Sequence, residues 1–301
     1  MFTWYPGGRD YVRWFNGPRL THVTEDPLAM TFPESAAQAE LIDAMPRYAD
    51  VFAAGQFFRR GGHTLTGILR LNGQSVFGKY VDFRCKSFTS RLRYCFMPSR
   101  GLWSAFMADV LQKNDIATPR VLGAGETRRN GLVTESYVFN EILNVTDAGE
   151  FIRNTKGERH SVLKAIRQLM DGLHRLHAAR VTHGDLKLDN LYVDNGRTGF
   201  WDLDSALFWP GGIPSHMQFR NVARLTADIV LHVDALGVLS HDFSVEKLTD
   251  CCCDAYGGMD RAQLFSWVTQ WLKTRPLQHL PLRSPTGNGV PDPLTTPPVA
   301  A

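Results

Sequence analysis

The clearest periodic pattern of the chain lies in its second half. Apolar residues recur there at alternating intervals of four and three positions: Val162, Ile166, Leu169, Leu173 and Leu176. This spacing places all five side chains on one face of a helix with 3.6 residues per turn. The pattern therefore predicts a long amphipathic helix, and we expect further helices at about 219–236 and 263–273.

Short β-like runs dominate the first half instead. Residues 64–71 and 75–80 read as two strands, and Asn72-Gly73 between them is the strongest short signal for a hairpin turn. Further elements are expected as follows: a helix at 35–45, a helix at 102–113, and strands at 120–126 and 136–139.

A strand-rich part followed by a helix-rich part indicates an α+β, two-lobed fold. We expect an N-terminal extension at 1–52, a strand-rich lobe at 53–143 and a helical lobe at 144–275. The segment 276–301 holds seven prolines and few large apolar residues. Because such a segment cannot bury a core, we expect a disordered tail.

Composition excludes several classes of protein. The chain has 301 residues, of which 44% are hydrophobic and 21% are charged, as in ordinary globular proteins. No stretch approaches 18 consecutive apolar residues, and the first ten residues lack the basic and apolar regions of a signal peptide. We therefore expect a cytoplasmic protein.

Basic residues gather in one part of the chain, although the formal net charge is only +3. Between Phe57 and Arg100, nine Lys and Arg residues stand against one acid, Asp82. Such a surplus attracts anionic partners, for example acidic lipid head groups or phosphorylated sugars, or it forms a solvated basic face. The region lacks the aromatic interleaving and the Cys/His spacing of nucleic-acid-binding modules, so no nucleic acid is expected.

The most specific motif is His183-Gly184-Asp185-Leu186-Lys187-Leu188-Asp189-Asn190, followed twelve residues later by Asp202. The motif comes after the long helix and before a predicted β-hairpin, and Asp202 ends the returning strand. This order is typical of the catalytic loop of a kinase and its metal-binding aspartate.

The residue types of this motif suit phosphoryl transfer, which depends on positioning and on neutralising charge. Asp185 would accept the proton of the attacking hydroxyl group. Asn190 and Asp202 offer hard oxygen ligands for Mg²⁺. Lys187 could reach the transferring phosphate as a point charge.

A kinase also needs a lysine on a strand of the small lobe to hold the nucleotide phosphates. Lys79 ends the predicted strand 76–79 at a suitable distance upstream, where the alternative would be an edge charge. Gly61 and Gly62 lie where a glycine-rich phosphate loop belongs, although two glycines match the G-x-G-x-x-G pattern only in part.

From about Arg59 to Tyr256 the chain resembles the lipopolysaccharide kinases, a family that includes the Kdo kinases and the core heptose kinases. The resemblance rests on short segments that occur in the same order along the chain. They are FGK at 77–79, DIATPR at 115–120, ESYVFNEIL at 135–143, HGDLKLDN at 183–190, WDLDSA at 201–206, RNVARL at 220–225 and DAY at 254–256.

The resemblance implies a protein-kinase-like fold, ATP and Mg²⁺ as cofactors, and phosphorylation of a heptose or Kdo hydroxyl in the inner core of lipopolysaccharide. The partner would be this core or another phosphorylated glycolipid, reached by peripheral contact with the inner membrane surface. The family pattern assigns roles to these residues: Asp185 as base, Asn190 and Asp202 as metal ligands, Lys79 as the ATP lysine, and Glu141 and Leu143 as part of the hinge.

Two departures from the family pattern keep other functions open. The expected helix 102–113 holds no glutamate to pair with Lys79, only Asp109, and Asn221 stands near a position where the family often has an aspartate. The chain could instead be another kinase-like phosphotransferase, acting on a protein or an aminoglycoside, or a nucleotide-binding scaffold without turnover. No A-P-E-like segment follows Asp202, which disfavours a protein kinase.

Overall fold

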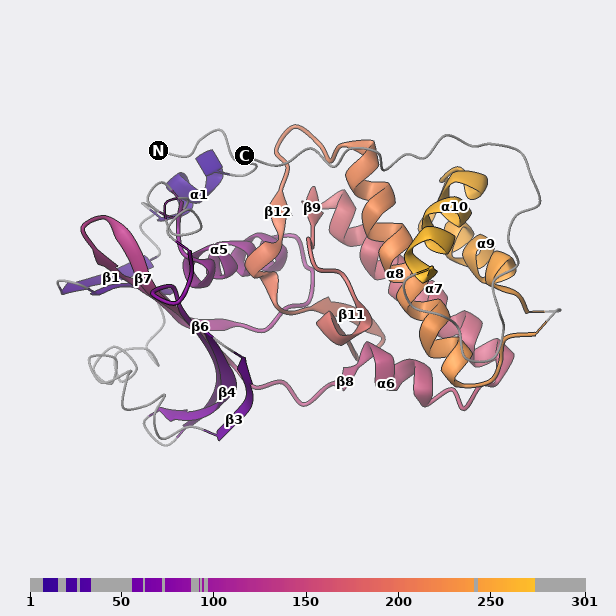
Figure 1. The fold of residues 1–301 in the computed structure, drawn as a ribbon, viewed down its shortest axis with the longest axis horizontal. Helices are drawn as coiled ribbons and strands as arrows, with labels where there is room; N and C mark the ends of the chain where they lie inside the picture. The colour runs from indigo at the N-terminus through magenta and orange to yellow at the C-terminus, as the bar shows by residue number, and fades with distance from the viewer. Residues whose placement is uncertain are drawn as a thin grey trace.

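A seven-stranded antiparallel sheet forms the first lobe of the protein (Figure 1). In this computed structural model the described residues are 8–15, 20–25, 28–33, 56–61, 63–71, 74–87, 92, 94, 97–240 and 243–273. The strands follow one another across the sheet in this order: β1 (Leu20–Glu25), β2 (Leu28–Pro33), β6 (Val121–Arg129), β7 (Leu132–Asn140), β5 (Gln74–Asp82), β4 (Thr64–Leu71) and β3 (Gln56–Gly61).

The predicted hairpin is confirmed, because β4 and β5 pair along their whole length, from Thr64 opposite Val81 to Leu71 opposite Gln74. The strands expected near 120–126 and 136–139 are also present, as β6 and β7. Strands β1 and β2 were not predicted, and they lie within the segment expected to be an N-terminal extension. The helix expected at 35–45 and the tail at 276–301 lie outside the described residues.

Helix α5 (Arg100–Lys113) packs tightly against this sheet. A Cβ atom at Gly101 would lie 2.2 Å from the backbone oxygen of Tyr137, and the Gly101 N–H donates to Ser136 Oγ at 2.8 Å. Helix α1 (Gly8–Phe15) contacts α5 through the ring of Tyr11, which meets Phe106 at a centroid distance of 5.6 Å. The start of α5 is therefore fixed in place on strand β7.

Among the described residues, the second lobe is built from the helices α6 (Ala148–Arg153), α7 (Arg159–Ala178), α8 (Ser215–Ala235), α9 (Val245–Tyr256) and α10 (Arg261–Leu272) (Figure 1). All five residues of the predicted apolar stripe are fully buried on α7, so the helix and its face are confirmed. Helices α8 and α10 match the helices expected at 219–236 and 263–273. Helix α9, which contains three consecutive cysteines, was not predicted.

A small hairpin separates the segment 183–190 from Asp202, so the expected catalytic residues lie on either side of it in the chain. Strands β10 (Leu191–Asp194) and β11 (Arg197–Phe200) form it, with β8 (Thr146–Asp147) beside β10. Strand β9 (Val181–Thr182) pairs with β12 (Leu207–Phe208). The hairpin lies on α7 at Gly172, where a Cβ atom would be 2.4 Å from Thr198 Cβ. The α+β, two-lobed arrangement is thus confirmed.

Within the described residues, no helix combines the length and the apolar character needed to span a bilayer.

Replacing Gly101 by alanine should destabilise the protein, because the new methyl group has no room against the β7 backbone. We expect a loss of about 1–3 kcal/mol in the free energy of unfolding, measured by urea denaturation. Gln112→Ala, on an exposed position of the same helix, should change stability by less than about 0.5 kcal/mol. Equal stability of the two variants would contradict the close approach at Gly101.

Candidate active site

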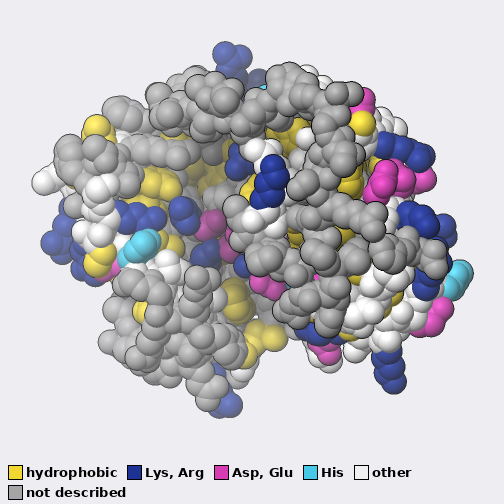
Figure 2. Space-filling view, turned by 45° about the vertical axis from the view of Figure 1, so that its right-hand side comes forward, with side chains coloured by type: hydrophobic (Ala, Val, Ile, Leu, Met, Phe, Trp, Pro, Cys, Tyr) yellow, Lys and Arg dark blue, Asp and Glu magenta, His cyan; other side chains and the backbone are white. Residues whose placement is uncertain are grey.

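A cavity of about 980 Å³ lies between the two lobes, within the size range of small-molecule sites. Figure 2 shows a hollow in the surface of the molecule, in which Lys or Arg side chains lie near Asp or Glu side chains. The wall combines apolar side chains with a group of charged and amide side chains. The apolar residues include Ile68, Phe77, Val138, Ile142 and Leu143, and the polar ones include Lys79, Asp185, Asn190, Asp202 and Asp204.

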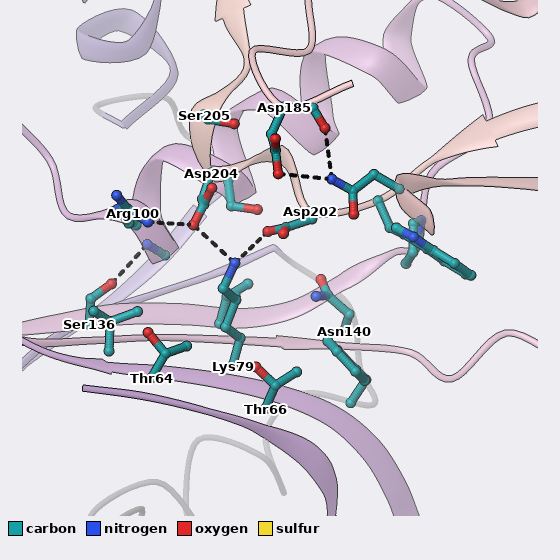
Figure 3. A pocket seen from close by; sticks show the side chains of 18 of the residues that line it. Thr64, Thr66, Lys79, Arg100, Ser136, Asn140, Asp185, Asp202, Asp204 and Ser205 are labelled. Carbon is teal, nitrogen blue, oxygen red and sulfur yellow. Dashed lines mark hydrogen bonds and ion pairs between the residues drawn. The ribbon is translucent and has the colours of Figure 1, made fainter. Parts of the chain in front are cut away.

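Lys79 lies at the centre of the polar part of the cavity (Figure 3). It extends from β5 and forms ion pairs with Asp202 and with Asp204, whose Oδ2 lies 3.0 Å from its Nζ. Burial alone would lower the pKa of Lys79, but the two carboxylates outweigh burial and raise it. Lys79 therefore carries its charge at neutral pH.

The turn at Asp202 aims its carboxylate at Lys79. Asp202 has a left-handed backbone, with φ 59° and ψ 53°, which aspartate tolerates better than most residues. Its side chain remains 37% exposed. The neighbouring Trp201 is held by two hydrogen bonds, from its Nε1 to the Asp189 oxygen at 2.6 Å and from His183 Nε2 to its own carbonyl at 2.8 Å. The segment 183–190, the expected catalytic loop, and the Asp202 turn are therefore joined directly.

His183 serves as the buried link between these two segments. Complete burial lowers the pKa of His183, so the ring is neutral and donates through Nε2 to the Trp201 carbonyl. The next residue, Gly184, has φ +76°, and a Cβ atom there would lie 2.1 Å from the Ser205 oxygen. Only glycine fits at this contact.

Asp185 is held from two sides. Asn190 Nδ2 donates to the Asp185 backbone oxygen at 2.8 Å and to its Oδ2 at 3.3 Å. Arg224 of α8 forms an ion pair with the other carboxylate oxygen, and its guanidinium lies 5.5 Å from the centroid of the Trp271 ring. Burial would raise the pKa of Asp185, but the charge and the hydrogen bond of Arg224 outweigh burial and lower it. The carboxylate is therefore ionised at neutral pH.

Helix α8 also holds the backbone of the catalytic loop. Asn221 Oδ1 accepts the His183 N–H at 3.2 Å, and Asp228 Oδ2 accepts the Leu188 N–H at 2.7 Å. An amide oxygen can accept this bond as a carboxylate would, so Asn221 is suited to hold the His183 backbone. Sequence reasoning missed the roles of Arg224 and Asp228. Their spacing from position 221, three and seven residues, would have placed them on one helix face.

Of the other expected site residues, the structure places Glu141 and Leu143 at the cavity. Glu141 accepts the Arg120 N–H at 2.7 Å. Gly61 ends β3 opposite Thr64, whereas Gly62 lies outside the described residues. Lys187 does not line the cavity; its Nζ lies 3.2 Å from Asp189 Oδ2.

The basic residues at the end of the sheet are partly paired within the protein. Arg84 lies 2.8 Å from Asp82 and 3.2 Å from Glu135, and Arg100 lies 3.3 Å from Asp204. Arg91 and Arg93, in the same basic stretch, lie outside the described residues. Arg84 and Arg100 are therefore balanced by acids and do not form a purely basic face.

Comparisons with known proteins support the fold. No family model matches the chain, and no curated protein matches it. The chain is similar to a solved structure described as "WaaP in complex with acyl carrier protein", with a TM-score of 0.56 and 18% sequence identity. The match covers 81% of this chain and 98% of that chain. At this identity the similarity shows a shared kinase-like fold alone.

Replacing Arg224 by glutamine should change the pH dependence of any reaction that uses Asp185 as a base. Loss of the guanidinium raises the pKa of Asp185, so the acidic limb of the kcat/KM profile should move to higher pH. Arg220→Gln, at an exposed position one turn away on α8, should leave the profile unchanged. An unshifted limb in the Arg224 variant would show that another group titrates there.

Proposed function

We propose that the protein is an ATP-dependent kinase that phosphorylates a heptose or Kdo hydroxyl of the lipopolysaccharide inner core. The observation that carries this proposal is the meeting of Lys79, Asp185, Asn190 and Asp202 in one cleft, from three separate segments of the chain. Phosphoryl transfer needs this combination: a cation for the phosphates, a carboxylate beside the acceptor and oxygen ligands for Mg²⁺.

The side chains in the cleft fit Mg²⁺ and a nucleotide. Asn190 uses its amide NH₂ group to hold Asp185, and its Oδ1 accepts no hydrogen bond from any of the described residues. Within the same residues no group of three or more His, Cys, Asp or Glu could hold a metal ion. Magnesium sites in phosphotransferases commonly use one or two protein ligands together with phosphate oxygens. Asp202 and Asn190 would be these ligands.

The nucleotide would lie along the rest of the cleft. Lys79 would bind its phosphates, and the linker at Glu141, Ile142 and Leu143, which lines the cavity, would meet its base. When bound, MgATP supplies the phosphoryl group and neutralises charge on it.

Asp185 would act on the acceptor. Because Arg224 keeps it ionised and Asn190 fixes its orientation, Asp185 can orient the sugar hydroxyl and accept its proton. The sugar oxygen forms a new bond to the γ-phosphorus as the bond to the bridging oxygen breaks, and ADP leaves. Lys187 would approach the transferring phosphate after releasing Asp189, since both side chains are partly exposed.

The choice of a lipopolysaccharide acceptor rests on the motif resemblance and on the surplus of basic residues between Phe57 and Arg100. A phosphorylated glycolipid would be attracted to such a region, and the protein would meet it by peripheral contact with the inner membrane surface. WaaP, whose fold the chain shares, was solved with acyl carrier protein. The structural similarity to WaaP supports the proposal only as far as a kinase-like phosphotransferase.

A scaffold without turnover is one alternative, since α5 holds no glutamate for Lys79. The arrangement of Lys79 weakens this argument, because the lysine already has two carboxylate partners from the Asp202 turn.

The direct test is phosphate transfer from ATP to purified core lipopolysaccharide from strains truncated at successive sugars. We expect transfer to stop when the acceptor sugar is absent. Asp185→Asn should lower turnover by about 10²–10⁴-fold, because general-base help is lost, with little change in ATP affinity. Asp194→Asn, at an exposed position on the adjacent hairpin, is the matched control. Nucleotide binding without transfer to any core would favour the scaffold, and transfer to an aminoglycoside or a protein would favour another phosphotransferase.

Asp202→Asn should weaken ATP binding in the presence of Mg²⁺ by about tenfold or more, since an amide lacks the charge that holds a hard cation. Asparagine tolerates the left-handed backbone, so the variant changes charge with little change in shape. Titration calorimetry with millimolar Mg²⁺ and with EDTA measures the difference. If the variant loses the same ATP affinity with Mg²⁺ and with EDTA, the metal does not bind at Asp202.

A further inference from the structure

Helix α5 presents no acid to Lys79. In kinases the strand lysine pairs with a glutamate on this helix. The residues of α5 that line the cavity are Arg100, Gly101 and Ser104. The one acid of the helix, Asp109, lies 2.5 Å from Lys113 and does not line the cavity. The protein must therefore hold its lysine in another way.

We propose that Asp204 is the residue that positions Lys79 for phosphate binding, in place of the helix glutamate. The inference rests on the proposed kinase function. Asp204 Oδ2 lies 3.0 Å from Lys79 Nζ, and the Asp204 side chain is only 11% exposed, against 37% for Asp202. The two acids would therefore have different roles. The more exposed Asp202 would bind the metal, and the more buried Asp204 would position the lysine.

Arg100 fixes Asp204 from the other side. Its Nη1 lies 3.3 Å from the same oxygen, Oδ2, that contacts Lys79. Figure 3 shows Asp204 between the two cations. An oxygen that already contacts two positive groups is a poor place for a divalent ion, because both groups repel it. This arrangement favours a positioning role for Asp204 over a role as a second metal ligand.

Helix α5 acts on Lys79 indirectly, through the turn that carries Asp204. Besides the Arg100 contact, Trp103 Nε1 donates to the Ala206 oxygen at 2.7 Å, in a buried bond just after the turn. The other side of the helix is fixed on β7 at Gly101. The helix therefore holds the turn at two points, and the turn supplies the carboxylate.

The test is Asp204→Asn, with Asp204→Ser as a second variant in case the first does not fold. In the nucleotide-free protein, acylation of Lys79 by an amine-reactive ester is followed by peptide mass spectrometry at fixed pH. Lys79 should react about tenfold faster in the variant, because losing one charge-assisted hydrogen bond releases the amine from the turn more often and lets the reagent reach it. Asp109→Asn, which removes the acid of α5, is the matched control and should leave the rate unchanged.

In turnover assays with MgATP, Asp204→Asn should lower kcat by about 10–100-fold and leave the KM for the acceptor within about twofold. Unchanged acylation of Lys79 in both variants would overturn the inference. An increased Mg²⁺ requirement without faster acylation would also overturn it, and would assign Asp204 to the metal.

These outcomes are separate from failure of the proposed function. If wild-type protein neither binds ATP nor transfers phosphate, the kinase proposal fails whatever the acylation rates are. If wild-type protein is active and Asp204→Asn behaves like Asp109→Asn, only the role of Asp204 fails.

Discussion

The candidate site depends on one interaction across the two lobes, the pairing of Lys79 with the acids of the Asp202–Asp204 turn. Neither lobe alone holds the set of groups that phosphoryl transfer needs. The sheet contributes the cation, and the helical lobe contributes the acids and the amide. Because Lys79 and Asp204 are largely removed from water, their attraction is screened less than that of an exposed pair. The pairing joins the two lobes directly across the cleft.

The candidate site also depends on helix α8, which holds the loop that carries Asp185. Its Asn221, Arg224 and Asp228 contact the catalytic loop at His183, Asp185 and Leu188 respectively. Hydrogen bonds that involve charged groups contribute about 1.5–3 kcal/mol each, more than neutral ones. The loop has little regular structure of its own, so these contacts from a long, buried helix give it one defined shape. The position and ionisation of the expected base thus depend on a helix later in the sequence.

Local sequence patterns predict those parts of the structure that form from residues close together in the chain. The apolar stripe of α7 and the hairpin of β4 and β5 are visible as periodicity and turn chemistry, and the motif that ends at Asn190 has fixed spacing. Strands β1 and β2 have no clear period, so they could not be predicted. The pairing of Asp204 with Lys79 and Arg100 depends on how α5 lies on the sheet, and no spacing in the sequence encodes that. Gly101 is an example. A glycine is needed there because the Tyr137 backbone leaves no space for a side chain, and this contact is visible only in the folded structure.

The ion pairs of Lys79 join positions 123 and 125 residues apart in the chain. Closing so long a loop is costly in chain entropy, and this cost is met only after both lobes have formed their own local contacts. The cleft is therefore expected to be among the last parts of the protein to assemble during folding. A substitution that slows docking of the lobes would reduce the fraction of molecules that mature, while each mature molecule would have an unchanged cleft.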